Sequence, residues 1–171
     1  AYIAGDGVGQ NYEAAVRWLE RASEAGLNRS HYTLGKMYHY GLGVAVDVKR
    51  ATALYKAAAE AGLDKAQYNL AKAYRDGNGV VQDHALSVEW FRRAAEQGYA
   101  KAQNHLATRF AKGQGIKADL IEAFKWTSLA AHQGHLQAQE NLRVLKSRLT
   151  PAQRAEGARR AADFAPVRTG R

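Results

Sequence analysis

Apolar positions between residues 64 and 99 recur with the period of an α-helix, in two separate blocks. The first block reads DKAQYNLAKAYRD, and its apolar stripe comprises Ala66, Leu70, Ala71 and Tyr74. The second block reads HALSVEWFRRAAEQ, and its apolar stripe comprises Leu86, Trp90, Phe91, Ala94 and Ala95. Each stripe covers one face of its helix, so neither helix can bury its apolar surface alone. We therefore expect the two helices to pack against each other and against further helices.

The stretch between the two blocks, GNGVVQD, contains two glycines and allows two interpretations. A Gly-x-Gly pair can belong to a phosphate-binding loop, but that fingerprint needs a preceding strand and a third glycine that opens a helix. Here a helical block precedes the pair, and Asp83 follows it in the position of a helix N-cap. Gly98 ends the second block, where a left-handed residue is usual. The stretch is therefore interpreted as a connector between helices.

The same arrangement recurs at a fixed interval of 36 residues. The Gly-x-Gly pairs are Gly5/Gly7, Gly41/Gly43, Gly77/Gly79 and Gly113/Gly115. The residues in the N-cap position are Asn11, Asp47, Asp83 and Asp119. A second glycine series comprises Gly26, Gly62, Gly98 and Gly134. Four copies without an insertion predict a stack of helix pairs, in which each pair contacts its neighbours.

The pattern closely resembles the Sel-1-like repeat family, a branch of the tetratricopeptide-type helical repeats. The residues that carry the resemblance in one copy are Ala66, Leu70, Tyr74, Gly77, Gly79, Val80, Asp83, Trp90, Ala94, Ala95 and Gly98. Their equivalents in the next copy are Ala102, Leu106, Phe110, Gly113, Gly115, Ile116, Asp119, Trp126, Ala130, Ala131 and Gly134. The resemblance covers roughly residues 1–149. It implies an all-α fold, and it is to the bacterial members of the family. The expected architecture is a right-handed α/α solenoid of 36-residue helix-turn-helix repeats with a C-terminal capping helix.

The repeat frame divides the chain into six segments. We expect a partial repeat (its second helix) at 1–27, full repeats at 28–63, 64–99 and 100–135, a C-terminal capping helical hairpin at 136–164, and a flexible tail at 165–171. Ala1 and Tyr2 align with Met37 and Tyr38, so most of the first helix of the first copy is expected to be missing. The last helix is predicted to begin at LTPAQ, where Thr150 is the N-cap and Pro151 takes the first helical position.

Charge is distributed unevenly along the chain. The whole sequence has a formal net charge of +9, no cysteine and two prolines. Residues 143–171 hold 8 Lys/Arg against 2 Asp/Glu, whereas residues 1–142 hold 17 against 14. The basic C-terminal segment can attract anionic partners, or it can simply keep the surface soluble. No apolar run approaches the roughly 18 residues of a membrane span.

The sequence offers no constellation of catalytic or metal-ligating residues. His132 and His135 flank Gly134 in HQGH, but no further ligands lie nearby in the sequence, and both histidines are interpreted as polar residues at a helix end. No serine lies in a nucleophile elbow. We therefore expect no enzyme activity, no metal and no cofactor.

The resemblance implies that the first helix of each pair lines the concave face of the solenoid, where partners bind. The candidate partner-binding residues are Arg29, Tyr32, Lys36, Tyr40, Lys65, Tyr68, Asn69, Lys72, Arg75, Lys101, Asn104, His105, Lys112 and Asn141. Lysines in this set suit carboxylates, asparagines can bond a peptide backbone, and tyrosines add rigid contact area.

Two classes of partner follow from this face. The leading hypothesis is a protein-protein interaction scaffold that binds an acidic peptide segment or a domain of another protein, in a role such as signalling. The alternative is a module that binds peptidoglycan or another anionic polymer of the cell envelope. Nucleic acid is disfavoured because residues 1–142 are only mildly basic. Members of the resembling family imply a periplasmic or secreted location, and a cytoplasmic one stays open.

Overall fold

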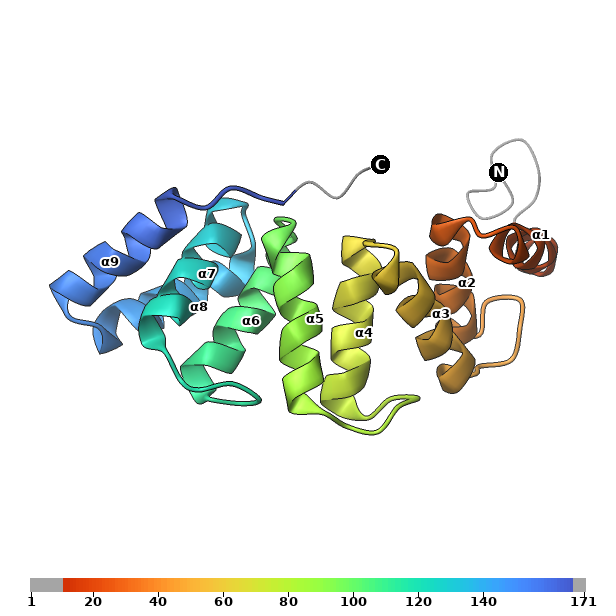
Figure 1. Ribbon diagram of the computed structural model, residues 1–171, viewed down its shortest axis with the longest axis horizontal. Coiled ribbons are helices and arrows are strands. Elements are labelled where there is room, and N and C mark those ends of the chain that lie inside the picture. Colours follow the sequence, from red (N-terminus) through yellow and green to blue (C-terminus); the bar gives the residue numbers. More distant parts are fainter. Residues whose placement is uncertain (1–10, 168–171) are drawn as a thin grey trace. The chain divides into compact units, whose positions relative to one another are not determined.

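The computed structural model describes residues 11–167, and every regular element in that range is an α-helix (Figure 1). The helices are α1 (Tyr12–Glu24), α2 (Asn28–Tyr40), α3 (Val48–Glu60), α4 (Asp64–Asp76), α5 (His84–Glu96), α6 (Ala100–Lys112), α7 (Leu120–His132), α8 (Leu136–Arg148) and α9 (Pro151–Ala162). They form two compact units, residues 1–82 with α1–α4 and residues 83–171 with α5–α9. The predicted partial first helix of the first copy lies outside the described residues.

The capping residues predicted from the sequence are confirmed. Asp47, Asp83 and Asp119 each accept a hydrogen bond from a backbone N–H of the helix that follows, and Asn11 does the same for α1. The cap satisfies N–H groups that otherwise have no partner within the helix. Thr150 and Gln153, at the third position of the helix, form the predicted capping box at the start of α9.

The two glycines of each connector have different roles. Gly77 ends α4 in the left-handed conformation, with φ of +71°. Gly79 also has a positive φ, and it lies against the first turn of α3. A Cβ at this position would stand 2.5 Å from the Val48 carbonyl oxygen. The Thr52 hydroxyl donates a 2.9 Å hydrogen bond to the Asn78 carbonyl beside it. The stretch is a helix connector, as predicted, and Gly79 lets it lie against α3 of the same unit.

Alanine makes up much of the core of unit 1. In α3 and α4 the residues with at most 1% exposure include Ala51, Ala58, Ala59, Ala66 and Ala71. Small side chains let helix axes approach closely, so α3 packs tightly between α2 and α4. A polar cluster ties α1 to this core, because Glu20 accepts hydrogen bonds from the Tyr38 hydroxyl at 2.9 Å and from Arg50 at 3.1 Å.

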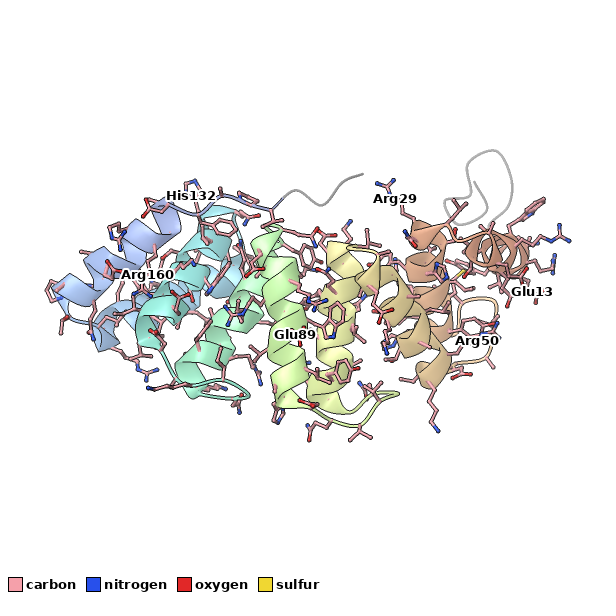
Figure 2. The ribbon with its side chains drawn as sticks, viewed as in Figure 1. Glu13, Arg29, Arg50, Glu89, His132 and Arg160 are labelled. Atoms are coloured by element: carbon pink, nitrogen blue, oxygen red, sulfur yellow. The ribbon has the colours of Figure 1, made fainter. Side chains whose placement is uncertain are left out.

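In unit 2, the last helix takes a position that the repeat frame does not provide. The capping hairpin was expected to pair α8 with α9, but α9 packs along α7. Gly157 permits this approach, since a Cβ there would lie 2.8 Å from the Phe124 ring. Arg160 extends from α9 and forms a 2.7 Å ion pair with Glu122 of α7 (Figure 2). This position follows from two residues of α9 that contact α7: Gly157 packs against a ring of α7, and Arg160 forms an ion pair with it.

The chain beyond α9 lies against the rest of unit 2. Phe164 stacks edge-on against Trp126 with ring centroids 5.4 Å apart. The Val167 N–H donates a 2.8 Å hydrogen bond to the Glu96 carbonyl at the end of α5. The tail was predicted to be flexible from residue 165 onward, and residues 168–171 of it lie outside the described range. Two residues predicted for the core, Tyr74 and Leu86, are only half-buried.

Candidate functional site

The candidate residues of unit 1 come from α2 and α4. We call their shared surface the α2/α4 face; its members are Arg29, Tyr32, Lys36, Tyr40, Lys65, Tyr68, Asn69, Lys72 and Arg75. Tyr32 of α2 lies close enough to the Asn69 side chain of α4 to interact with it, and this links the two helices. Arg29 and Lys65 lie in the first turns of their helices and are exposed, and Arg29 points away from the unit (Figure 2). The two helices are therefore connected in the middle of the α2/α4 face, and the side chains of their first turns are exposed to solvent.

A cavity of about 240 Å³ opens on the α2/α4 face. It is lined by His39, Tyr40, Thr52, Tyr55, Asn69, Lys72, Ala73, Arg75, Asp76 and Asn78. Four of the predicted residues, from Tyr40 to Arg75, therefore meet in one hollow. Its wall is largely polar, and it suits one small polar or charged group rather than a large apolar ligand.

One of the residues that line the cavity is Tyr55, which comes from α3. Gly35 of α2 makes room for it, because a Cβ there would lie 2.9 Å from two carbons of the ring. Burial raises the pKa of the Tyr55 hydroxyl well above its usual range, and the nearby Tyr40 and Tyr32 hydroxyls add to the shift. Tyr55 therefore stays a neutral hydrogen-bonding group at any physiological pH.

The cations of the face differ in how they are paired. Arg75 is already engaged: its Nε and Nη2 donate two 2.7 Å hydrogen bonds to the Asp76 carboxylate. These bonds raise the pKa of Arg75. Among the described residues, no carboxylate forms an ion pair with Lys36 or Lys72. Each lysine instead lies over a tyrosine ring one helical turn earlier, with Nζ to centroid distances of 5.7 and 5.6 Å. Lys72 thus brings an unneutralised charge into the cavity.

The candidate residues of unit 2 form a different arrangement. The Asn141 amide donates a 2.9 Å hydrogen bond to the Asn104 side chain, which links α6 and α8. His105 stacks on Phe91 with centroids 5.0 Å apart, so its ring takes part in the packing of α5 against α6. Lys101 and Lys112 are exposed at opposite ends of α6. The Asn104 and Asn141 side chains therefore meet between α6 and α8.

Tyr55 was not among the residues predicted for the site, although it lines the cavity. Tyr55 lies on α3, the second helix of its pair. The resemblance implied binding residues only on the first helix of each pair. The glycine at position 35 is the signal that could have found it, since the equivalent positions 71 and 107 hold alanine. Thr52 and Asn78 were missed for the same reason, because both lie outside the first helices.

The histidines of HQGH lie at helix ends. His132 is in the last turn of α7, and His135 caps α8 by accepting a 3.3 Å hydrogen bond from the Ala138 N–H. Within residues 11–167, no group of three histidine, aspartate or glutamate side chains is placed to hold a metal ion. No helix in the same range is both long enough and apolar enough to span a membrane.

Comparisons with known proteins agree with this architecture. The family model described as Sel1 repeat matches residues 1–27, 29–63, 64–99 and 100–135. The crystal structure of c5321, a protective antigen present in uropathogenic Escherichia coli strains that displays an SLR fold, superimposes with a TM-score of 0.87. Its sequence identity is 30%, and the match covers 95% of this chain and 35% of that one.

A second crystal structure, of a Sel1 repeat protein from Oxalobacter formigenes, superimposes with a TM-score of 0.82 at 27% identity. That match covers 97% of this chain and 70% of the other. The chain spans about a third of the length of c5321. Among curated proteins, none matches it. The similarities confirm the all-α helical-repeat fold class predicted from the sequence.

Proposed function

This chain belongs to the Sel1 repeat family, and we propose that its α2/α4 face binds an acidic segment of a partner protein. Proteins of this family are generally non-catalytic scaffolds for protein-protein interaction. The proposal adds the chemistry of the partner and the place where it binds.

The observation that carries the proposal is the state of Lys72 in the cavity. Its ammonium group has no carboxylate partner among the described residues, and the neighbouring Arg75 is neutralised by Asp76. A glutamate or aspartate side chain entering the cavity would pair with Lys72, and the Asn69 amide lies beside it in the same wall. A charge-assisted hydrogen bond of this kind is shorter and stronger than a neutral one. Partial burial of Lys72 also reduces the screening of its charge.

The aromatic residues around the cavity supply contact area for the rest of the segment. Tyr40, the last residue of α2, is 62% exposed. His39 packs edge-on against it with centroids 4.7 Å apart and so holds the Tyr40 ring in place. A rigid, exposed tyrosine beside a polar hollow is typical of the anchor positions in protein interfaces.

The test is affinity capture with the parent chain and two charge-reversal variants. Lys72→Glu places a negative charge in the cavity, whereas Lys56→Glu makes the same change on an exposed position of α3 outside it. We expect a partner that the parent and Lys56→Glu retain and that Lys72→Glu loses, with retention falling as salt is raised. If Lys72→Glu retains every protein that the parent retains, the cavity is not the binding site.

A peptide experiment then tests the acidic chemistry. The retained partner would be divided into overlapping peptides, and binding to the parent chain would be measured by fluorescence anisotropy. The binding peptide should contain a glutamate or aspartate whose replacement by glutamine or asparagine weakens binding about tenfold, which is a typical effect for a charged hydrogen bond. A binding peptide that tolerates replacement of all its acidic residues would refute the proposal.

A further inference from the structure

We propose that a groove between α8 and α9 in unit 2 binds an amphipathic α-helix with acidic residues along its edges, supplied by another protein. The groove has a volume of about 1040 Å³. Its apolar lining comes from α7, α8, α9 and the chain after α9, and it comprises Phe124, Leu129, Leu142, Ala155, Ala158, Ala161, Ala162, Phe164 and Pro166. This surface is independent of the α2/α4 face, because every residue that lines it belongs to unit 2.

The groove exists because α8 lacks the helix that would cover it. In the repeat, the second helix of each pair packs against the first, as α3 does on α2 and α7 does on α6. The helix that follows α8 is α9, and it packs along α7 instead. The consequence is visible at one core position of the repeat. Leu34, Leu70 and Leu106 are at most 2% exposed, whereas the equivalent Leu142 is only half-buried.

The wall that faces Leu142 is shaped for a helix. Ala155, Ala158 and Ala162 follow one another at helical spacing on α9, and all three are exposed. Small side chains on one wall let the axis of a docking helix come close, while leucine-sized side chains of that helix can reach the floor. The volume also exceeds what one drug-sized ligand usually fills. The position that the missing second helix leaves open therefore suits a helix from elsewhere.

Charge selects the kind of helix. Lys146 of α8 and Arg154 of α9 both line the groove, near the turn that joins these two helices, and we call this basic pair its rim. The Arg154 guanidinium donates a 3.2 Å hydrogen bond to the Lys146 carbonyl, and neither side chain forms an ion pair with a carboxylate in the described part of the chain. Residues 143–171 hold 8 Lys/Arg against 2 Asp/Glu, so α9 of a second copy would be repelled from this rim. A helix with glutamates flanking its apolar stripe would be attracted.

The experiment starts from a displayed library of random peptides of about 16 residues, or four helical turns, selected on the full chain. Enriched peptides would be synthesised, and their affinities measured by fluorescence anisotropy for the parent and three variants. Ala158→Trp fills the groove from an exposed position, so it should leave the far-UV circular dichroism and the melting temperature unchanged. The double variant Lys146→Glu/Arg154→Glu reverses the charge of the rim. Lys72→Glu serves as the control on the other unit.

We expect enriched peptides with apolar residues at i, i+3, i+4 and i+7 and with acidic residues beside them. Ala158→Trp and the rim reversal should each weaken their binding about tenfold or more, and Lys72→Glu should not change it. Enrichment that yields no peptide sensitive to Ala158→Trp would overturn the proposal, as would sensitive peptides without the helical pattern. A third outcome would also overturn the proposal: no such peptide is found, and the chain binds dodecanoate in a way that Ala158→Trp abolishes. The groove would then be assigned to an acyl chain.

Discussion

Replacement of Gly79 by alanine tests the connector more sharply than any other single change. The backbone of Gly79 has φ of +74°, a left-handed conformation that side chains other than hydrogen disfavour. The added Cβ would also stand 2.5 Å from the Val48 carbonyl oxygen and 2.8 Å from the Thr52 hydroxyl oxygen. The first contact is with backbone in the first turn of α3, so no side-chain rotation can relieve it.

Gly77 provides the matched control within the same connector. Its φ is +71°, and the nearest atom to an added Cβ is the Gln82 Cβ at 3.4 Å, an ordinary contact. Gly77→Ala should therefore cost only the conformational strain, about 1–2 kcal/mol. Gly79→Ala carries the same strain and an overpacking cost of about 1–3 kcal/mol. The difference between the two variants, about 1–3 kcal/mol, isolates the close approach of the connector to α3.

The assay is urea denaturation followed by far-UV circular dichroism, combined with hydrogen exchange of peptides from α3 measured by mass spectrometry. Gly79→Ala should lower the denaturation midpoint more than Gly77→Ala and should speed exchange within residues 48–60. Equal midpoints for the two variants would refute the reasoning, because they would show that the connector does not bear on α3.

Three further predictions concern a cap, a close contact and an ion-pair cluster. Asp119→Ala should cost about 0.5–2 kcal/mol in urea denaturation, because two backbone N–H groups lose their acceptor, whereas Asp119→Asn should keep most of the stability. Gly35→Ala should cost about 1–3 kcal/mol in the same assay, since its Cβ would lie 2.9 Å from the tyrosine ring of α3. Hydrogen bonds from Arg159 and Arg160 lower the pKa of Glu156 to about 2 from an ordinary value of 4.5. The stabilisation is therefore present above about pH 4.5 and is lost as the pH falls towards 2. An NMR titration should place the Glu156 midpoint near 2, and removal of both arginines should raise it.

The local features of this fold could be predicted from the sequence because they depend on neighbouring residues. An aspartate before an apolar stripe caps the helix that follows it, and a glycine in a left-handed position ends one. The position of α9 could not be predicted in this way. Thr150 and Pro151 specify where the helix begins, but they do not specify which helix it packs on. That choice depends on how Gly157 and Arg160 fit a surface of α7, and a 36-residue interval carries no information on that surface.

In the candidate site, the sequence likewise predicted where residues lie but not how they are paired. The interval placed Lys72 and Arg75 on one face, but it could not show that Asp76 neutralises the arginine. Adjacent side chains on a helix ordinarily diverge, but this pair meets at the end of α4, where Asp76 is the last residue before the left-handed Gly77. Of the two cations, the lysine is therefore the one available to a partner.

Both proposed binding surfaces arise where a copy departs from the repeat. The cavity of unit 1 depends on Gly35 facing Tyr55, whereas the equivalent positions in α6 and α7 hold Ala107 and Thr127, and Thr127 has no aromatic ring. The groove of unit 2 depends on the displacement of α9. A copy that follows the pattern fully buries its apolar faces against its neighbours and has little left to offer a partner. Variants that restore the pattern should therefore remove binding while they preserve the fold, and variants of the repeated core should weaken the fold before they alter recognition.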